Sequence, residues 1–491
     1  MTYDDLRYNE VRQKSAHNAF QQLEGIYDQV VYWRIRSLEL DLHRGKLGHG
    51  GLKGDWYIYH GAHNPNTTVH RLSDFLRLCR GIRRAIQRHE VITVFLDIRD
   101  AFHATPTASQ SGDALDRLLI KELGEHRLYR PKDLLDRSPG SASLQASVRA
   151  AGWPTLADLR GKILFVLTGP KDLLGTYLGA KSPGDRVAFL SSRVDHASEV
   201  PGTSPDIVFF NMSARKARLA SKVQRLGFVS RAYYINDETR WRKAVAHNCH
   251  HIATDDINAR KERWSRTARP VTGFPFQALR GSPPSQPEPG QICGVWARSG
   301  DIWGAVDSFY YQFADCRGQP DERYELYISG ANSFGDDWLK GGIIARASLA
   351  GGAPYFGVFR VAEHHGLRVQ YRVGARGSTV AVEKSLGLGV IAEDTLMFVR
   401  LHVTRGGRRA RGWGSIDGIA WTEIASFDFE QPLRYHGIGV SSHRELSGAK
   451  FLFGVPGDRP QPPFTRGKLI GPRVEKYGGG ADWEGSERWR I

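Results

Sequence analysis

The sequence has few cysteines, and their spacing is not typical of a metal site. The four cysteines of this 491-residue chain, Cys79, Cys249, Cys293 and Cys316, are far apart and form no CxxC pair. This argues against a zinc site, which usually contains closely spaced ligand pairs. Cys293 and Cys316 could form a disulfide, and two free buried thiols are at least as good an interpretation.

Long apolar runs are absent too. No uninterrupted stretch approaches the roughly 20 residues that a membrane-spanning helix needs. The chain begins with an acidic and polar segment that does not resemble a secretory signal. We therefore expect either a cytoplasmic or peripheral membrane protein, or a secreted protein whose leader has been removed.

The sequence also lacks the patterns of nucleic-acid-binding proteins, although its formal net charge is +16. It contains no zinc-finger spacing, no RNP-like aromatic motif and no basic leucine zipper. The excess of arginine could simply be a compositional property of the surface. If it marks a partner, we expect an anionic membrane surface or a phosphate-bearing molecule rather than nucleic acid.

Short apolar segments alternate with amphipathic ones through the first part of the chain. The segments that we expect to be strands are 13–20, 36–43, 56–60, 94–97, 163–167, 207–210, 229–235 and 251–254. Such apolar strands are typical of sheets buried on both faces. The expected helices include 73–86, with Ser73 as its N-cap, 214–226 and 239–247. This alternation favours an α/β fold, a (β/α)8 TIM-type barrel, over an open doubly wound sheet.

A stretch rich in proline, serine and glycine separates two parts of different periodicity. Its composition predicts a linker over residues 281–291, after a barrel over 1–280. The segments that we expect to be strands after it are 324–329, 341–346, 355–360, 367–372 and 397–403. Their alternation and the glycine-rich turns between them predict an all-β jelly-roll sandwich over 292–453. Residues 454–491 are rich in glycine, proline and charge, and we expect an irregular arm there.

Carboxylates and an amide stand near the ends of the expected barrel strands. Glu39 and Asp41 project to the same face of their strand, because side chains alternate along a strand. Asn18 and Asp97 come from neighbouring strands and complete a ligand set made only of oxygen atoms. Ligands of this kind select calcium, with magnesium as the second choice, rather than zinc.

Two histidines accompany this ligand set and remain available for chemistry. His17 and His60 also lie at strand ends. A metal flanked by two histidines suits the attack of a hydroxyl group on a phosphodiester, since one histidine can stabilise the transition state and the other can protonate the leaving oxygen. Either histidine alone would more often be an ordinary polar residue, and the combination is what indicates a site.

Four short blocks carry a resemblance to a known family. They are His17-Asn18-Ala19-Phe20, Leu38-Glu39-Leu40-Asp41, Tyr59-His60-Gly61 and Phe95-Leu96-Asp97. Together they resemble the metal-dependent branch of phosphatidylinositol-specific phospholipase C, over roughly residues 8–260.

The resemblance implies a role for each matching residue. His17 would stabilise the pentavalent phosphorus, and His60 would act as the general acid and then as the base. Calcium would be held by Asn18, Glu39, Asp41 and Asp97. Glu39 would also help to deprotonate the 2-hydroxyl of inositol. The metal-independent bacterial branch has an arginine in place of a ligand, so Asp41 places this chain on the metal-dependent side.

The same resemblance implies a set of substrate-binding residues. Arg231 would hold phosphate or inositol hydroxyls and Tyr233 would pack on the sugar ring, with Ser213 near the headgroup. The chain departs from the family where Asp97 replaces the usual glutamate. It also lacks the lysines that bind ring phosphates, with only Lys171 nearby. These departures favour unphosphorylated phosphatidylinositol, a glycosylated inositol lipid or another phosphodiester.

The second part resembles concanavalin-like sandwiches of the laminin-G or jelly-roll kind, through residues 340–346 and 415–421. Such modules often bind glycans by stacking exposed aromatic side chains on sugar faces. The candidates for such stacking are Trp338, Tyr355, Trp413 and Trp421, although core packing would be the commoner role for any one of them.

The leading hypothesis is a calcium-dependent phosphodiesterase that releases diacylglycerol and a cyclic or linear inositol phosphate. One alternative is a glycerophosphodiester phosphodiesterase-like enzyme that acts on a soluble diester. Another is a non-catalytic, lectin-like membrane or glycan-binding protein built on a barrel. Because both His17 and His60 are present, the sequence favours an enzyme.

Overall fold

The computed structural model describes residues 3–22, 24–45, 52–61, 69–201, 204–257, 264, 276–279, 292–297, 300–317, 321–330, 338–361, 366–383, 398–441, 449–456 and 462–470. The chain divides into two compact units, residues 1–83 with 87–288 and residues 84–86 with 289–491. The expected linker, 281–291, lies outside the described residues, so the predicted domain boundaries stay predictions. Among the described residues, no helix combines the length and apolarity needed to cross a membrane.

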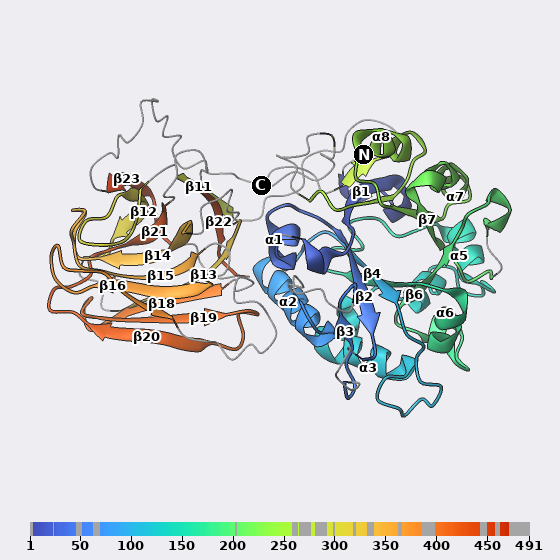
Figure 1. Ribbon diagram of the computed structural model, residues 1–491, viewed down its shortest axis with the longest axis horizontal. Helices are drawn as coiled ribbons and strands as arrows, with labels where there is room; N and C mark the ends of the chain where they lie inside the picture. Colours follow the sequence, from blue (N-terminus) through green and yellow to red (C-terminus); the bar gives the residue numbers. More distant parts are fainter. Residues whose placement is uncertain are drawn as a thin grey trace. The chain divides into compact units, whose positions relative to one another are not determined.

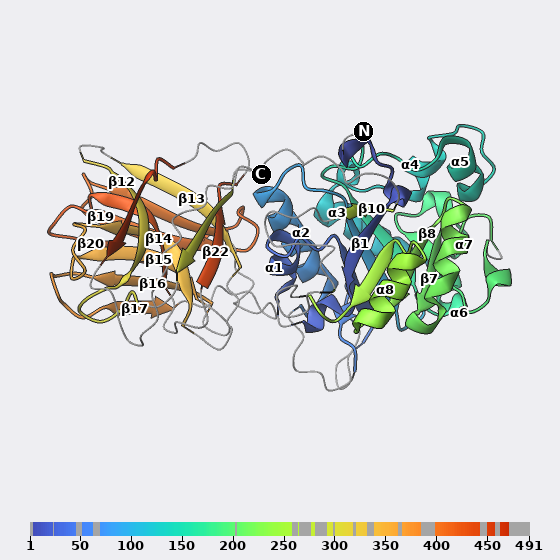
Figure 2. The same ribbon diagram turned by 90° about the horizontal axis from the view of Figure 1, so that it is seen from above.

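The first unit is built on a closed barrel of eight parallel strands (Figures 1 and 2). The barrel strands are β1 (Val11–Ala16), β2 (Ser37–His43), β4 (Ile92–Ile98), β5 (Ile163–Thr168), β6 (Phe189–Arg193), β7 (Phe209–Ser213), β8 (Val229–Tyr233) and β9 (His251–Thr254). Their order around the barrel is β1-β2-β4-β5-β6-β7-β8-β9. The pairing of Ser15 with Ser37 between β1 and β2 closes the circle. The predicted barrel is therefore confirmed.

Helices surround these strands on the outside (Figures 1 and 2). The α-helices are α1 (Ile26–Val31), α2 (Leu72–Ala85), α3 (Gly112–Leu123), α4 (Pro131–Leu135), α5 (Leu144–Ala151), α6 (Lys171–Leu178), α7 (Ala220–Arg225) and α8 (Glu238–Ala246). Short 3-10 helices occupy Tyr3–Asp5, Tyr8–Glu10, Ala19–Gln21, Glu125–Arg127, Pro183–Asp185, Ala197–Glu199 and Ala214–Leu219.

Helix α2 begins one residue earlier than the sequence predicts, and the predicted cap is wrong. Ser73 lies inside the first turn, and its backbone N–H and hydroxyl both donate to the carboxylate of Asp55, at 3.2 and 2.6 Å. Asp55 thus accepts hydrogen bonds at the helix N-terminus, where backbone donors lack partners within the helix. A residue distant in sequence performs this role, so the local pattern could not show it.

One predicted barrel strand is wrong, and one barrel strand was missed. The segment 56–60 contributes only β3 (Tyr57–Ile58), which pairs antiparallel with β2 outside the barrel circle. The eighth barrel strand is instead β6, which the sequence did not indicate. Its sequence, Phe-Leu-Ser-Ser-Arg, has only two apolar residues and so lacks the apolar run expected of a buried strand. Another short strand, β10 (Phe276–Ala278), pairs antiparallel with β1.

The second unit consists of two antiparallel sheets. One has the order β11 (Ile292–Ala297), β22 (Ala449–Gly454), β13 (Glu322–Ser329), β18 (Phe398–Thr404), β19 (Arg409–Ser415) and β20 (Thr422–Asp428). The other has the order β17 (Val380–Glu383), β16 (Leu367–Arg372), β15 (Tyr355–Val361), β14 (Lys340–Arg346), β21 (Tyr435–Ser441), β12 (Phe309–Asp315) and β23 (Arg466–Ile470).

The sheets pack face to face where glycines let aromatic rings approach the opposing backbone. A Cβ atom on Gly341 would lie 2.7 Å from the ring of Phe451 in the other sheet. The predicted all-β character is confirmed. The expectation of an irregular arm after 454 is wrong for residues 466–470, because β23 pairs with β12 there. Its sequence, Arg-Gly-Lys-Leu-Ile, does not look like a strand, and only the exposed edge of β12 provides it with partners.

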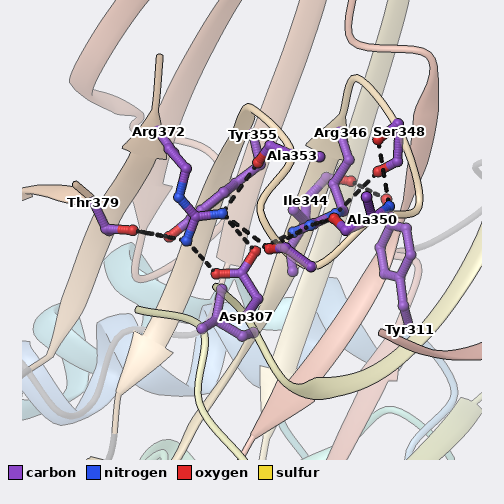
Figure 3. Close-up of polar contacts among 12 residues, drawn as sticks. Asp307, Tyr311, Ile344, Arg346, Ser348, Ala350, Ala353, Tyr355, Arg372 and Thr379 are labelled. Carbon is purple, nitrogen blue, oxygen red and sulfur yellow. Dashed lines mark hydrogen bonds and ion pairs between the residues drawn. The ribbon is translucent and has the colours of Figure 1, made fainter. Parts of the chain in front are cut away.

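A buried ion cluster organises one end of the second unit (Figure 3). The carboxylate of Asp307 binds Arg346 at 2.7 Å and Arg372 at 2.6 Å, and all three side chains are fully buried. Backbone carbonyl oxygens compensate the surplus positive charge. Arg346 donates to Ala350 O and Arg372 donates to Gly304 O, each at 2.8 Å. The cluster therefore ties the loop that contains Gly304 and Asp307, and the loop that contains Ala350, to β14 and β16.

Cys316 is a free, buried thiol, so the disulfide that it could have formed with Cys293 is not present.

Candidate active site

The polar residues singled out from the sequence gather at one rim of the barrel. In a barrel of parallel strands all carboxyl ends lie at the same rim, where active sites of such barrels are found. His17 follows β1, Glu39 and Asp41 lie in β2, and Asp97 lies near the end of β4. A cavity of about 800 Å³ opens there, and His17, Glu39, His60 and Asp97 all line it.

Three carboxylates form the centre of the site. Oxygen atoms of Glu39, Asp41 and Asp97 all lie within 4.8 Å of one another. Asp41 and Asp97 are register partners on the adjacent parallel strands β2 and β4, which explains why their side chains meet. Asp41 is completely buried, and its Oδ1 has no hydrogen-bond partner among the described residues.

These three residues fit a hard divalent cation. They supply only oxygen ligands, which calcium and magnesium prefer. An orphaned carboxylate oxygen at 0% exposure is costly unless it has a partner of opposite charge. Asn18 joins the cluster through its backbone, because its N–H donates to Glu39 Oε2 at 3.3 Å. Its left-handed backbone, with φ of 46°, turns the chain at the end of β1.

His17 lies on one side of the carboxylates and is held by a residue that the sequence did not single out. Its Nδ1 is 2.8 Å from Oδ1 of Asp255, and its Nε2 is 3.7 Å from Oε2 of Glu39. Asp255 is positioned in turn by Asn236, whose Nδ2 donates to its other oxygen. Tyr234 packs against the ring of His17 with centroids 4.6 Å apart. The imidazole is therefore fixed in orientation.

His60 approaches the carboxylates from the other side. Its Nδ1 donates to Oδ2 of Asp41 at 2.8 Å, and its side chain is partly exposed to the cavity. This hydrogen bond raises the pKa of His60 above its ordinary value, against the opposing effect of partial burial. Asp41 therefore favours the protonated form of His60.

Arg99 is the second functional candidate that the sequence did not reveal. Its Nη2 lies 3.0 Å from Oδ2 of Asp41 and 2.7 Å from Oδ2 of Asp97. Arg99 thus bridges two of the three carboxylates from the cavity side. Burial, together with the neighbouring Glu39, raises the pKa of Asp97 to about 7 despite the opposing effect of Arg99. The sequence feature that could have indicated Arg99 as a site residue is its position directly after β4, two residues beyond Asp97.

Arg231, which we expect to bind the substrate, pairs with Glu39 in this structure. It is 1% exposed, its Nη2 is 2.6 Å from Glu39 Oε2, and its Nη1 donates to Asn211 Oδ1 at 3.2 Å. Arg231 is not among the described residues that line the cavity, and its substrate-binding role stays a prediction.

Two of the other predicted substrate-binding residues line the cavity, and one is not among the described lining residues. Lys171 and Tyr233 line the cavity, Lys171 from the first turn of α6 and Tyr233 from the end of β8. Ser213 is the last residue of β7 and is not among the described lining residues. Asn211, two residues earlier, does line the cavity and also donates to Thr168 Oγ1 at 2.9 Å.

The fold and the site together define a class of protein: a parallel barrel whose rim carries an oxygen-ligand cluster between two histidines. A sequence model of the family described as phosphoinositide phospholipase C, Ca²⁺-dependent, matches residues 61–267. That segment includes Asp97 and Arg231 and begins just after His60. The match agrees with the family resemblance and supports the interpretation of this chain as a phosphodiesterase of the phospholipase C kind.

The structure is also similar to solved barrels. A calcium-dependent phosphoinositol-specific phospholipase C from Pseudomonas sp. is 19% identical, with a TM-score of 0.47, over 56% of this chain and 96% of that chain. A Ca²⁺-dependent phosphatidylinositol-specific phospholipase C from Streptomyces antibioticus is 19% identical, with a TM-score of 0.43, over 54% and 98%. A glycerophosphodiester phosphodiesterase from Parabacteroides distasonis is 11% identical, with a TM-score of 0.31, over 52% and 97%. No curated protein sequence matches the chain.

Proposed function

We propose that this protein is a calcium-dependent phosphodiesterase that cleaves an inositol phospholipid, or a glycosylated inositol lipid, by attack of the neighbouring hydroxyl. The observation that carries the proposal is that His17 and His60 line one cavity beside the carboxylate cluster, His17 near Glu39 and His60 bonded to Asp41. A cluster of this kind can place a phosphate between two nitrogen donors and beside three carboxylates that can ligate a cation.

His60 is the general acid of the proposed reaction. Its bond to Asp41 raises its pKa above the ordinary value for histidine, which favours the imidazolium form that a general acid needs. In that state Nδ1 donates to Asp41, and Nε2–H is available to the leaving alcohol oxygen. After the cyclic phosphate has formed, the neutral ring can accept a proton from water and support ring opening.

His17 and Glu39 act on the other side of the phosphate. With Nδ1–H donated to Asp255, His17 is held with Nε2 near Glu39 and can donate to a phosphoryl oxygen when protonated. Glu39 forms an ion pair with Arg231 and accepts a hydrogen bond from the N–H of Asn18, which fixes its carboxylate next to the cavity. It is the proposed acceptor of the proton of the attacking hydroxyl.

The cation would be held by Glu39, Asp41 and Asp97, with Asn18 at the edge of the cluster. When bound, calcium would lower the pKa of the attacking hydroxyl and neutralise charge on the phosphate. Magnesium is the second choice for the same ligands.

The headgroup proposal rests on the cations available in the cavity. Lys171 and Arg193 line the cavity with exposed side chains, whereas Arg99 pairs with Asp41 and Asp97, and Arg231 is engaged by Glu39 and Asn211. Part of the positive charge near the site is therefore already engaged, which supports an unphosphorylated inositol. Tyr233, at the end of β8, is the proposed contact for the ring face.

Two partners are proposed in addition to the substrate. The net charge of +16 supports binding to an anionic membrane surface. The second unit, as a β-sandwich, is proposed to bind a glycan. Trp338 is 40% exposed and Trp413 and Trp421 are half-buried, so they remain candidates for stacking. Tyr355 is fully buried and bonded to Thr379, so the prediction of a stacking role for it is wrong.

The test is a panel of phosphodiesters, with phosphorus NMR to identify the products. It should contain phosphatidylinositol, its phosphates, phosphatidylcholine and glycerophosphodiesters, each with calcium and with a chelator. We expect cleavage of the inositol lipid through a cyclic phosphate, dependent on calcium, and a loss of about a hundredfold or more in His17→Ala and in His60→Ala. Cleavage of glycerophosphodiesters alone would favour the glycerophosphodiesterase alternative, and full activity in chelator would remove the metal from the proposal.

A further inference from the structure

Basic side chains gather at a second place on the first unit, away from the catalytic rim. They are Arg83 in α2, His126 and Arg127 in the 3-10 helix Glu125–Arg127, and Lys162, which directly precedes β5. We call these four residues the basic cluster. Leu128 pairs with Ile163 in an isolated bridge, which places the 3-10 helix beside the first residue of β5.

The basic cluster lies at the opposite end of the barrel from the catalytic cavity. Strand β5 begins beside Lys162, whereas its last residue, Thr168, lines the cavity. A strand rises about 3.3 Å per residue, so the 6 residues of β5 separate the two places by about 20 Å. This exceeds the screening length of about 8 Å at physiological ionic strength, so an ion bound at one end has little electrostatic effect at the other.

Two hydrogen bonds connect the cluster around His126. Arg127 Nε donates to His126 Nε2 at 3.2 Å, and Lys162 Nζ donates to the backbone oxygen of His126 at 2.6 Å. The imidazole is therefore a neutral acceptor between cations. His126 is exposed, and the three cations are half-buried, so the cluster is open to solvent.

Among the residues that the structure describes, the cluster contains no compensating carboxylate. The two acidic residues closest to His126 in the sequence, Glu122 and Glu125, form ion pairs with Arg80 and Arg130. Within the same part of the chain, the three cations of the cluster form no ion pair with a carboxylate.

The lack of a carboxylate has an electrostatic consequence. Desolvation, and then the charges of the three cations, lower the pKa of His126. Burial, and then the charge of Arg127, lower the pKa of Arg83. Every charged neighbour that contributes to these two shifts is a cation. The like charges repel one another, and a bound anion would relieve this repulsion.

We propose that the basic cluster is a second anion site, which binds the doubly charged phosphate group of a phosphate monoester. The three cations come from three separate segments, which suits the three terminal oxygens of a tetrahedral phosphate better than the two oxygens of a carboxylate. A soluble phosphate monoester and a lipid with a monoester headgroup both present this group. The site shares no residue with the catalytic cavity, so the proposal goes beyond the proposed function.

The test uses the ring of His126 in the full chain as the reporter. Its NMR signal in histidine-labelled protein is assigned by its loss in His126→Gln. Methyl phosphate, a monoester, and dimethyl phosphate, a diester with one charge fewer, are titrated separately at equal ionic strength. We expect methyl phosphate to bind at least about tenfold more tightly and to raise the pKa of His126. Neither probe has an attacking hydroxyl, so the result is independent of turnover.

Single substitutions test the cations one at a time. Arg83→Gln and Lys162→Gln should each weaken the binding of methyl phosphate about fivefold, which is the effect of one surface charge pair. Without any anion, Arg83→Gln should also raise the pKa of His126, because one of the repelling charges is gone. Arg218→Gln is the matched control, since it removes an exposed arginine of the same unit from the 3-10 helix Ala214–Leu219 and should change the affinity less than about twofold.

Vesicles distinguish the two sources of the phosphate group. Phosphatidylcholine vesicles that contain phosphatidate, a monoester, are compared with vesicles that contain phosphatidylglycerol, a diester. A preference for phosphatidate that is lost in Lys162→Gln would assign the site to a lipid. Binding of methyl phosphate without such a preference would assign it to a soluble ligand. Equal affinity for the two methyl esters, a His126 signal that responds to neither, or unchanged affinity in both Arg83→Gln and Lys162→Gln would overturn the proposal.

Discussion

Arg99 offers the sharpest test of how the carboxylate cluster works. Its guanidinium bridges Asp41 and Asp97 at 3.0 and 2.7 Å, which are two of the three residues that would hold a cation. A cation that binds to this cluster must therefore either displace Arg99 or bind close to it against electrostatic repulsion. We expect Arg99→Gln, which keeps a polar side chain but removes the charge, to bind calcium more tightly than the wild type.

The expected magnitude follows from the geometry. Two unit charges about 4 Å apart interact by about 4 kcal/mol at the effective dielectric constant typical of a protein surface. The side chain of Arg99 is 39% exposed, so solvent screening reduces this considerably. We take about 1.4 kcal/mol as the remaining effect, which corresponds to about tenfold in the calcium dissociation constant.

Isothermal titration calorimetry of the calcium-free protein with calcium and with magnesium measures this directly, without any assay of activity. Arg193→Gln is the matched control, because Arg193 also lines the cavity but pairs with Asp195 rather than with the carboxylate cluster. The control should change the dissociation constant by less than about threefold. Unchanged or weaker calcium binding in Arg99→Gln would refute the reasoning and would show that Arg99 supports the ligands.

Three further predictions concern orientation and stability. Asp255→Asn should lower kcat at least about tenfold with little change in KM, because the carboxylate that fixes His17 loses its charge; an unchanged kcat in steady-state kinetics would contradict this role. Asp74 is buried and its pKa is raised to about 6 by burial, so the folded state binds an extra proton between about pH 4 and 6 and loses stability as pH rises through that window. Relative to Asp74→Asn, the wild type should lose about 2 kcal/mol between pH 4 and pH 7 in urea unfolding, and equal pH dependence in the two proteins would count against it. Asp307→Ala should destabilise the second unit by about 3–5 kcal/mol, since Arg346 and Arg372 would remain buried without their carboxylate, and calorimetry showing a smaller loss than for a surface substitution such as Glu423→Ala would disprove this.

The barrel strands could be predicted from the sequence because the apolar composition that marks a buried strand is a local property of the chain. Apolar segments such as 163–167 match β5 within one residue, since a strand buried on both faces must be apolar along its length. The same rule failed for β6, whose two serines line the cavity at the end of a short strand with only two apolar residues. It also misplaced 56–60, because an apolar segment can pair at the edge of a sheet as readily as inside it.

The sequence by itself determined which chemistry is available. His17, Asp41 and Asp97 lie at or near the ends of parallel strands, which meet at one rim, while Glu39 shares the strand of Asp41 and His60 follows the antiparallel β3. Only the tertiary structure decided how they are held and what surrounds them. Asp255 and Arg99 follow separate strands and contact His17 and the carboxylates, and Arg231 forms an ion pair with Glu39. These contacts depend on the order of strands around the barrel and on side-chain directions, which no local pattern in the chain encodes.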